Sequence, residues 1–458
     1  MNLVFPAAGR AGTAPPGLVA VGVVSSAAVA VGAAFAPLLT IGFAVAAALA
    51  VVTVGNLTYG VALFTLLTFF ETLPGLEGVA LSRPFGLILV VSWLAALARS
   101  PKKLPLLPRD RPALAYLLVL LLGWAAMSAS WAADSAVAMS SATRLALIVV
   151  LIFVVFTALR TPRDLVIVAW AFLAGAFLVS VVSIATGGNK AGRLALGELD
   201  PNFLAASLAA ALSLALFLVW GTAHRGVRLL LVVFMGIYAV AIVLTQSRAA
   251  LVALGVAAVA AAVFGGQFRG RVVGTIIVVA ALGIGYYAIA APSDVRARAA
   301  STVSDGRDPR LDSWAIALRI TAAHPPGGVG LGNFIVVESS YLSGQTNLFQ
   351  ARKLHNTPLV AHNIYLEVMS ELGVVGLVLF LAVLVATIVP AVRCVEGISS
   401  RSAYAGLTTR GLIVALIVLL TAYFFVSGTY AKHLWLLLGV LAAVTTVARN
   451  AGSGRTTD

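Results

Sequence analysis

The sequence predicts an all-α polytopic membrane protein with about 12 to 14 transmembrane helices and one large extracytoplasmic loop. Of its 458 residues, 61% are hydrophobic and only 10% are charged, whereas a soluble chain is about half apolar. Runs of roughly 18 or more apolar residues recur along almost the whole chain, the length that a membrane-spanning helix needs. These runs lack the alternation of transmembrane β-strands, so helices are predicted throughout.

Fourteen apolar runs are long enough to be candidate spans. The runs that meet near Pro37, Gly55 and Gln246 are separated by so little that pairs of them could be re-entrant or merged, which would reduce the number to twelve. In chain order the runs are 18–36, 38–55, 57–73, 84–99, 113–132, 143–159, 165–186, 202–220, 227–246, 248–265, 272–291, 372–392, 411–427 and 433–448.

The distribution of basic residues predicts the orientation. With both termini in the cytoplasm, 17 of the 30 lysines and arginines fall in cytoplasmic segments and 6 in short outer segments. The remaining 7 lie in a long outer loop, which the positive-inside rule discounts. A cleavable signal peptide is not indicated, because the first apolar run is long enough to span and others follow it.

The chain is predicted to form one integral domain with a loop insertion. Residues 1–291 hold about 11 spans, with outer-face loops near 187–202 and 246–248. Residues 292–371 form an extracytoplasmic catalytic loop with amphipathic helices, 372–449 return to the membrane, and 450–458 form a disordered tail.

Charge and cysteine content exclude several classes of function. The net charge of +14 is attributed to cytoplasmic bias and anion-binding sites rather than to nucleic acid. A single cysteine, Cys394, excludes an internal disulfide and a cysteine-based metal site.

Several cations lie on the predicted outer face, where the charge bias would not place them, and such charges are functional candidates. They include Arg193, in the polar stretch 190–203, Arg248, between two apolar runs, and Lys432. Asp200 or Asn202 could cap the helix that follows. The alternatives are a solvated loop for the first stretch and a snorkelling or structurally paired arginine for Arg248.

The long loop supplies two further groups. Leu311, Trp314 and Leu318 are spaced to share one face of an interfacial amphipathic helix, with Arg310 in its first turn. A solvated helix face is the competing interpretation. A turn rich in glycine and proline follows at Pro325–Gly332 and is predicted to reverse the chain tightly.

A histidine near the end of the loop is the candidate general base. His362 would share a helix face with Leu366 and Met369, and imidazole titrates near neutrality. A structural interfacial histidine is the alternative, and His355, which also precedes an asparagine, is a weaker rival.

The sequence contains no Gly-Lys pair of a nucleotide-binding loop, no Asp-x-Asp pair and no His-Glu-x-x-His. No cofactor or metal is therefore expected. A transferase on the outer face would need an activated donor that is already in the bilayer, and a lipid-linked diphosphate fits. Arginines would bind the diphosphate.

Taken in order, these pieces resemble the O-antigen ligase and O-antigen polymerase superfamily over roughly residues 190 to 390. The matching elements are Gly-Arg193 with Asp200-Pro201-Asn202, Ser247-Arg248-Ala-Ala, Arg310 with Trp314, Pro326 to Phe334, and His362-Asn363-Ile-Tyr365-Leu366 with Glu371-Leu-Gly373. Ligases often carry leucine four residues after the second arginine, where this chain has Val252, so the resemblance does not favour ligase over polymerase.

The resemblance implies a GT-C-type glycosyltransferase of the bacterial cytoplasmic (inner) membrane. It would move a glycan from an undecaprenyl diphosphate donor to a glycan, glycolipid or other envelope acceptor, with inversion and without a metal. Arg193, Arg248 and Arg310 would contact the diphosphate, and His362 would activate the acceptor hydroxyl. The substrate-binding candidates are Arg193, Asn202, Trp314, Asn363, Tyr365, Glu371 and Lys432.

Two other functions stay open from the sequence. A transporter or flippase of an anionic or lipid-linked solute would place charges near the membrane midplane, whereas the polar residues here gather at one face. A non-catalytic partner in envelope assembly would leave the outer arginines and the histidine without a common role.

Overall fold

The computed structural model describes residues 52–70, 82–99, 104–275, 309–341 and 359–452, except 54, 191, 197, 198 and 272, together with isolated positions up to 285. The regular secondary structure of this part of the chain is helical apart from one short hairpin of β1 (Asn189–Lys190) and β2 (Arg193–Leu194). The predicted all-α polytopic class is confirmed.

Eight of the described helices are long and apolar enough to cross a membrane. A helix of about 20 residues is about 30 Å long, which matches the hydrocarbon core of a bilayer. The eight are α6 (Pro112–Met127, extended by the 3₁₀ turn η1, Ser128–Ser130), α7 (Ser135–Ala158), α8 (Pro162–Ala185), α9 (Pro201–Gly221), α10 (Arg225–Thr245), α17 (Ile364–Ser399), α18 (Ala403–Ala422) and α19 (Lys432–Gly452).

Three shorter apolar helices complete the match with the predicted spans: α3 (Leu57–Leu67), α4 (Ser82–Arg99) and α11 (Arg248–Phe264). Small elements connect the others: α5 (Leu107–Asp110), η2 (Gly266–Phe268), α14 (Pro309–Ala323), α15 (Phe334–Val337) and η3 (Glu338–Tyr341). The predicted runs 18–36, 38–55 and 272–291, and loop residues 292–308 and 342–358 with His355, lie largely or wholly outside the described residues. Of the predicted tail, 450–452 continue α19, and 453–458 are outside.

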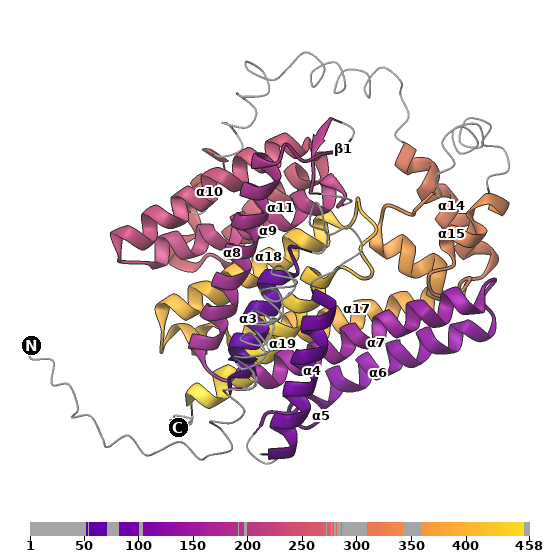
Figure 1. Ribbon diagram of the computed structural model, residues 1–458, viewed down its shortest axis with the longest axis horizontal. Helices are drawn as coiled ribbons and strands as arrows, with labels where there is room; N and C mark the ends of the chain where they lie inside the picture. Colours follow the sequence, from indigo (N-terminus) through magenta and orange to yellow (C-terminus); the bar gives the residue numbers. More distant parts are fainter. Residues whose placement is uncertain are drawn as a thin grey trace, which may run out of the picture.

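Helices α9 and α19 form the centre of the bundle (Figure 1). Helix α9 is rich in alanine and leucine and is buried by α18, α10, α11 and α8. Helix α19 packs against α17 and α7. A helix that is apolar all round belongs inside a bundle, and small residues let neighbouring backbones approach closely.

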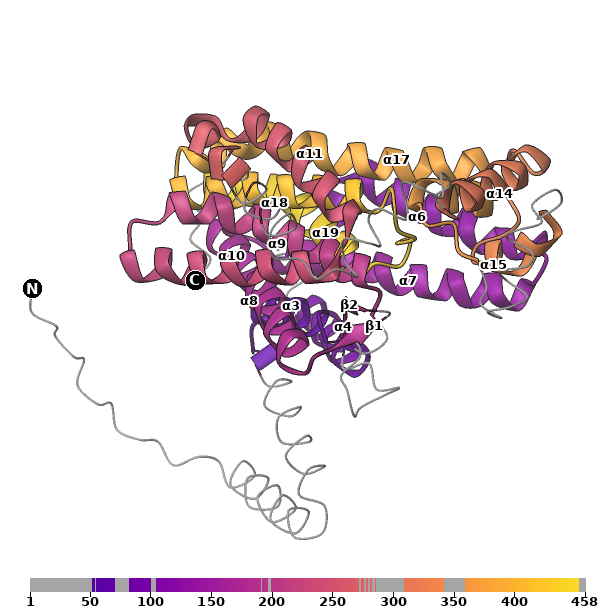
Figure 2. The same cartoon turned by 90° about the horizontal axis from the view of Figure 1, so that it is seen from above.

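Helices α6, α7 and α17 run side by side, and α14 and α15 lie at one end of this group in both views (Figures 1 and 2). The loop elements are therefore docked on the ends of spanning helices rather than held away from the bundle. This placement puts the glycine-rich turn next to the start of α17.

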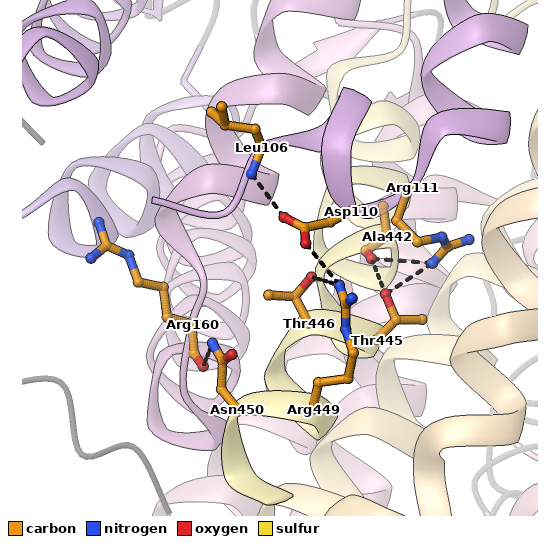
Figure 3. Close-up of polar contacts among 9 residues, drawn as sticks. All are labelled: Leu106, Asp110, Arg111, Arg160, Ala442, Thr445, Thr446, Arg449 and Asn450. Atoms are coloured by element: carbon orange, nitrogen blue, oxygen red, sulfur yellow. Dashed lines mark hydrogen bonds and ion pairs between the residues drawn. The ribbon is translucent and has the colours of Figure 1, made fainter. Parts of the chain in front are cut away.

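At the other end of the bundle, arginines bind the ends of the helices (Figure 3). We call this region the arginine end and define it by four residues. Arg449 donates to the Asp110 carboxylate over 3.3 Å, and Arg410 pairs with Glu396. Arg160 donates to the Thr157 carbonyl. The fourth residue is Arg111.

Arg111 corrects a defect in α17. Pro390 has no N–H to donate to the Ala386 carbonyl four residues earlier, and Arg111 Nη2 donates to that oxygen over 2.5 Å. Its Nη1 also donates to Thr445 Oγ1 over 3.0 Å (Figure 3). Burial lowers the pKa of the Arg111 guanidinium from its usual value. This arginine therefore ties α17 to α19.

Candidate functional site

The opposite end of the bundle, which we call the hairpin end, comprises β1–β2, the glycine-rich turn, the start of α17 and the α18–α19 connection (residues 423–431). Helices α3, α8 and α18 end there, and α4, α9 and α19 begin there. The predicted site residues lie in these elements or at the starts of α9, α11, α14 and α19, which adjoin them.

Arg193 and Asn202 join three segments of the hairpin end. Arg193 Nε donates to the Thr245 carbonyl over 2.8 Å, and its Nη2 donates to Asn202 Oδ1 over 2.7 Å. The same Asn202 oxygen accepts from Ser247 Oγ over 3.0 Å. Asp200, rather than Asn202, caps α9 by accepting from the Asn202 N–H. The hairpin, α9 and the α10–α11 turn are thereby fixed to one another.

This cluster holds Arg248 at the first position of α11. The chain turns at Gln246, which adopts a left-handed conformation (φ 52°), and Ser247 caps the new helix through the Ala250 N–H. The Arg248 side chain is exposed. A guanidinium beside a helix N-terminus combines two favourable terms for an anion.

The glycine-rich turn locks onto a break in α17. At Gly373 the backbone leaves helical geometry with φ 68°. The Val329 and Gly330 N–H groups donate to the Ser370 and Glu371 carbonyls over 3.0 and 2.8 Å, and the Val374 N–H donates to Pro325. N–H groups of the turn therefore donate to the α17 carbonyls that have no helical partner at the break.

The Glu371 side chain completes this contact. Its Oε2 accepts from the Gly332 N–H over 2.7 Å, and its Oε1 accepts from the Phe334 N–H over 3.3 Å. The residue is buried. In this structure the carboxylate holds the turn in place through these two hydrogen bonds. A role of Glu371 in substrate binding stays a prediction.

The connection between α6 and α7 also binds the glycine-rich turn and the asparagine that follows it. Asn333 exchanges hydrogen bonds with the backbone of Asp134: its Oδ1 accepts over 2.7 Å and its Nδ2 donates over 3.1 Å. Trp131 Nε1 donates to the Gly327 carbonyl over 3.1 Å. The predicted tight reversal is confirmed, with Gly328, Gly330 and Gly332 at positive φ.

Helix α14 brings Arg310 and Trp314 to the α18–α19 connection. The Trp314 ring meets Phe424 edge-on at 5.4 Å, and the Arg310 guanidinium lies 6.0 Å from the Phe425 ring centre. The buried face of α14 carries Ile316 and Ile320, whereas Leu311 and Leu318 are each 52% exposed. Of the predicted apolar stripe, Trp314 therefore packs on the connection, and Leu311 and Leu318 are exposed.

His362 lies outside α17, which corrects the expectation that it shares a helix face with Leu366 and Met369. Asn363 caps the helix by accepting from the Tyr365 and Leu366 N–H groups over 2.9 and 3.1 Å. The capping residue is extended, and His362 before it is left-handed with φ 49°. Such a conformation is strained for a residue other than glycine.

Hydrogen bonds to the end of α18 and to the α18–α19 connection hold this histidine. The His362 N–H donates to Ser427 Oγ over 3.0 Å, and the Ile364 N–H donates to the Tyr423 carbonyl over 2.9 Å. The Tyr365 hydroxyl donates to the Leu420 carbonyl over 3.1 Å. The α18–α19 connection therefore contacts both the α14 pair and the histidine.

Sequence reasoning missed this connection. Thr429 Oγ1 donates to Glu367 Oε2 over 2.7 Å, and Trp435 Nε1 fixes Thr429 through its carbonyl. The only predicted site residue beside it is Lys432, at the start of α19. The Lys432 Nζ donates to Ser82 Oγ over 2.7 Å. A short polar stretch between two apolar runs was the available signal.

A cavity of about 240 Å³ lies among these elements. It is lined by Thr68 and Phe69 after α3, by residues of α8 and α9 with Leu199, by the segment 427–433, and by Glu367. Lys432 lines it, but Arg248, Arg310 and His362 do not.

The structure thus joins Arg193 with Asn202, and places Arg310, Trp314, His362 and Tyr365 around the connection. The predicted meeting of Arg248, Arg310 and His362 in one cavity stays a prediction.

Among the described residues, no group of three or more histidine, cysteine, aspartate or glutamate side chains could hold a metal ion.

Residues 230–381 match the family model described as O-antigen ligase, and no curated protein matches the chain. The matched segment contains Arg248, Arg310, Trp314 and the block His362–Glu371; it leaves out Arg193, Asn202 and Lys432. The resemblance predicted from the motifs is thereby confirmed.

Proposed function

Given an O-antigen ligase match over 230–381 in a multi-pass chain, we propose that the protein is a membrane glycosyltransferase with an undecaprenyl diphosphate donor. It transfers the glycan to an acceptor hydroxyl on the outer face of the bacterial cytoplasmic membrane, as a ligase or polymerase of surface polysaccharide. The observation that carries the proposal is that the His362 N–H is hydrogen-bonded to Ser427 in the α18–α19 connection, which also contacts Arg310.

The orientation follows from the two ends of the bundle. The arginine end carries many of the basic residues that the charge bias assigns to the cytoplasm, and it is placed there with both termini. The hairpin end then faces outward. The exposed Leu311 and Leu318 of α14 lie along the membrane surface, where a lipid-linked donor is presented.

In the proposed reaction, His362 takes the proton of the acceptor hydroxyl as that oxygen attacks the anomeric carbon of the donor sugar. The bond from this carbon to the diphosphate oxygen breaks, and the configuration inverts because displacement occurs once. Undecaprenyl diphosphate leaves with the bonding electron pair.

Arg248 and Arg310 stabilise the charge that develops on the diphosphate, and no metal takes part. Arg193 contributes mainly by fixing the turn that presents Arg248, because its Nε and Nη2 donate to Thr245 and Asn202. Trp314, packed on Phe424, holds the α14 arginine beside the connection.

Transfer from purified undecaprenyl-diphosphate-linked glycan in liposomes, with chelator present, tests the proposal. His362→Ala is expected to lower turnover by about 10²–10⁴-fold, the usual contribution of a general base. Arg248→Ala is expected to lower it by about 10²–10³-fold, as for loss of one transition-state donor.

Matched controls lie at the opposite end. His224→Ala and Arg225→Ala change exposed residues at the cap and first position of α10, and both are expected to keep normal turnover. Normal activity in His362→Ala and Arg248→Ala, or donor binding without transfer to any acceptor, would contradict the proposal and favour transport or scaffolding.

A further inference from the structure

The cavity at the hairpin end has a chemistry of its own. Its apolar wall includes Phe69, Val179 and Phe203, and its polar lining includes three ionisable side chains, Glu367, Lys432 and His433, besides several hydroxyl-bearing residues. At about 240 Å³ it is much larger than one water molecule and smaller than a typical drug-sized pocket. It therefore suits a ligand of about one ring.

The polar side chains are held in place before any ligand arrives. Glu367 accepts from Thr429 Oγ1 over 2.7 Å, and Thr429 is fixed by Trp435 Nε1 over 2.8 Å. His433 is 6% exposed, and its Nδ1 lies 3.0 Å from Ser207 Oγ. Its Nε2 has no hydrogen-bond partner among the described residues, and a buried polar atom of this kind calls for a ligand or water.

The charges exclude several occupants. A phosphate would meet the Glu367 carboxylate, and a cation would meet the Lys432 ammonium group. A polyprenyl chain would desolvate both groups without offering hydrogen bonds in return. A neutral polyol is left, because its hydroxyls both donate to a carboxylate and accept from an ammonium group. Phe69 and Phe203 provide apolar surface for the C–H faces of a ring.

We infer that this cavity is a subsite for one neutral sugar ring, with Glu367, Lys432 and His433 as its hydroxyl-binding residues. The inference rests on the proposed function, since it supplies the place where one sugar of the donor or acceptor glycan is held. Ser427 lines the cavity and also binds the His362 N–H, so the subsite adjoins the proposed base.

Ligand-observed saturation-transfer NMR on the protein in nanodiscs tests the inference without requiring turnover. The probes are methyl glycosides of common hexoses and N-acetylhexosamines. At least one is expected to receive saturation at its ring protons. Val179→Phe, which fills the cavity, should abolish the signal, and Glu367→Gln should weaken binding by about tenfold or more, as for loss of a charge-assisted hydrogen bond.

Two controls separate folding from binding. Glu396→Gln makes the same change at the far end of α17, in a side chain that is 80% exposed, and is expected to leave binding unchanged. Undecaprenyl diphosphate without sugar should bind all four proteins equally. Its loss in Val179→Phe alone would show a carrier-lipid cavity and overturn the inference, as would a panel without cavity-dependent saturation.

Competition identifies the source of the ring. If glycan-linked donor displaces the methyl glycoside, the ring belongs to the donor; if both bind together, it belongs to the acceptor. The two proposals also fail separately. Cavity-dependent binding without transfer contradicts only the proposed function. Transfer with an unchanged acceptor KM and an unchanged donor KM in Val179→Phe contradicts only the subsite.

Discussion

The two ends of the bundle use arginine differently. At the arginine end, guanidinium groups bind acceptors of the chain itself. Arg111 donates to a carbonyl that proline leaves without a helical donor, and Arg410 and Arg449 each pair with a carboxylate. At the hairpin end, Arg248 is exposed and Arg193 fixes the turn that presents it. Arginine with satisfied donors holds helices together, whereas an arginine held at a surface is available for an anionic ligand.

The backbone differs in the same way. The proline of α17 at the arginine end is compensated by a side chain, and the helix continues to Ser399. At the hairpin end the helix breaks at Gly373, and His362 is held in a left-handed conformation. Strain at one end and repair at the other support the proposal that the functional site lies at the hairpin end.

The largest expected effect on stability is at this break. Gly373→Ala would drive a Cβ into the Pro326 carbonyl and force φ 68° on alanine. We expect a loss of about 2–5 kcal/mol in unfolding free energy, with a detached turn. Thermal unfolding in detergent checks this. Gly397→Ala in the same helix, with nothing within 4 Å of the added Cβ, should leave stability unchanged or raise it.

A smaller effect is expected from Arg111→Met. It leaves the Ala386 carbonyl without a donor and should cost about 1–3 kcal/mol. Adding Pro390→Ala restores the helical N–H, so part of this loss should be recovered in a double-mutant cycle. Arg109→Met, in an exposed neighbouring residue, is the control. Strictly additive effects of Arg111→Met and Pro390→Ala would refute the repair role.

The smallest effect is expected for the pair of Arg449 and Asp110, whose side chains are 56% and 21% exposed. Asp110→Asn should change the unfolding free energy by about 1 kcal/mol or less, as for most surface ion pairs. A melting curve in low and high salt measures it. A larger, salt-independent loss would mean that this pair, rather than Arg111, fastens the arginine end.

Hydropathy predicted the spans well, because a membrane helix must be apolar along its whole length; all eleven described apolar helices coincide with predicted runs. The Asp200 cap and the glycine-rich turn were likewise readable from local sequence. The prediction that His362 lies on the helix was wrong, because Asn363 accepts from the first free N–H groups and the helix begins only at Ile364.

Long-range contacts were not readable. Thr429 and Glu367 are 62 residues apart, and Arg111 meets the Ala386 carbonyl 275 residues away. Nothing in the local pattern around Ser427 or His433 distinguishes a cavity wall from an ordinary loop and helix start. The α18–α19 connection therefore became visible only in three dimensions.

One paired measurement tests the contrast between the ends most directly: turnover in liposomes and melting temperature for Arg248→Gln and Arg111→Gln. The account predicts that Arg248→Gln keeps the melting temperature and loses about 10²-fold or more in transfer. Arg111→Gln should melt earlier and keep its turnover per folded molecule. The reverse pattern, or equal losses of stability and activity in both, would contradict a division between a catalytic end and a structural end.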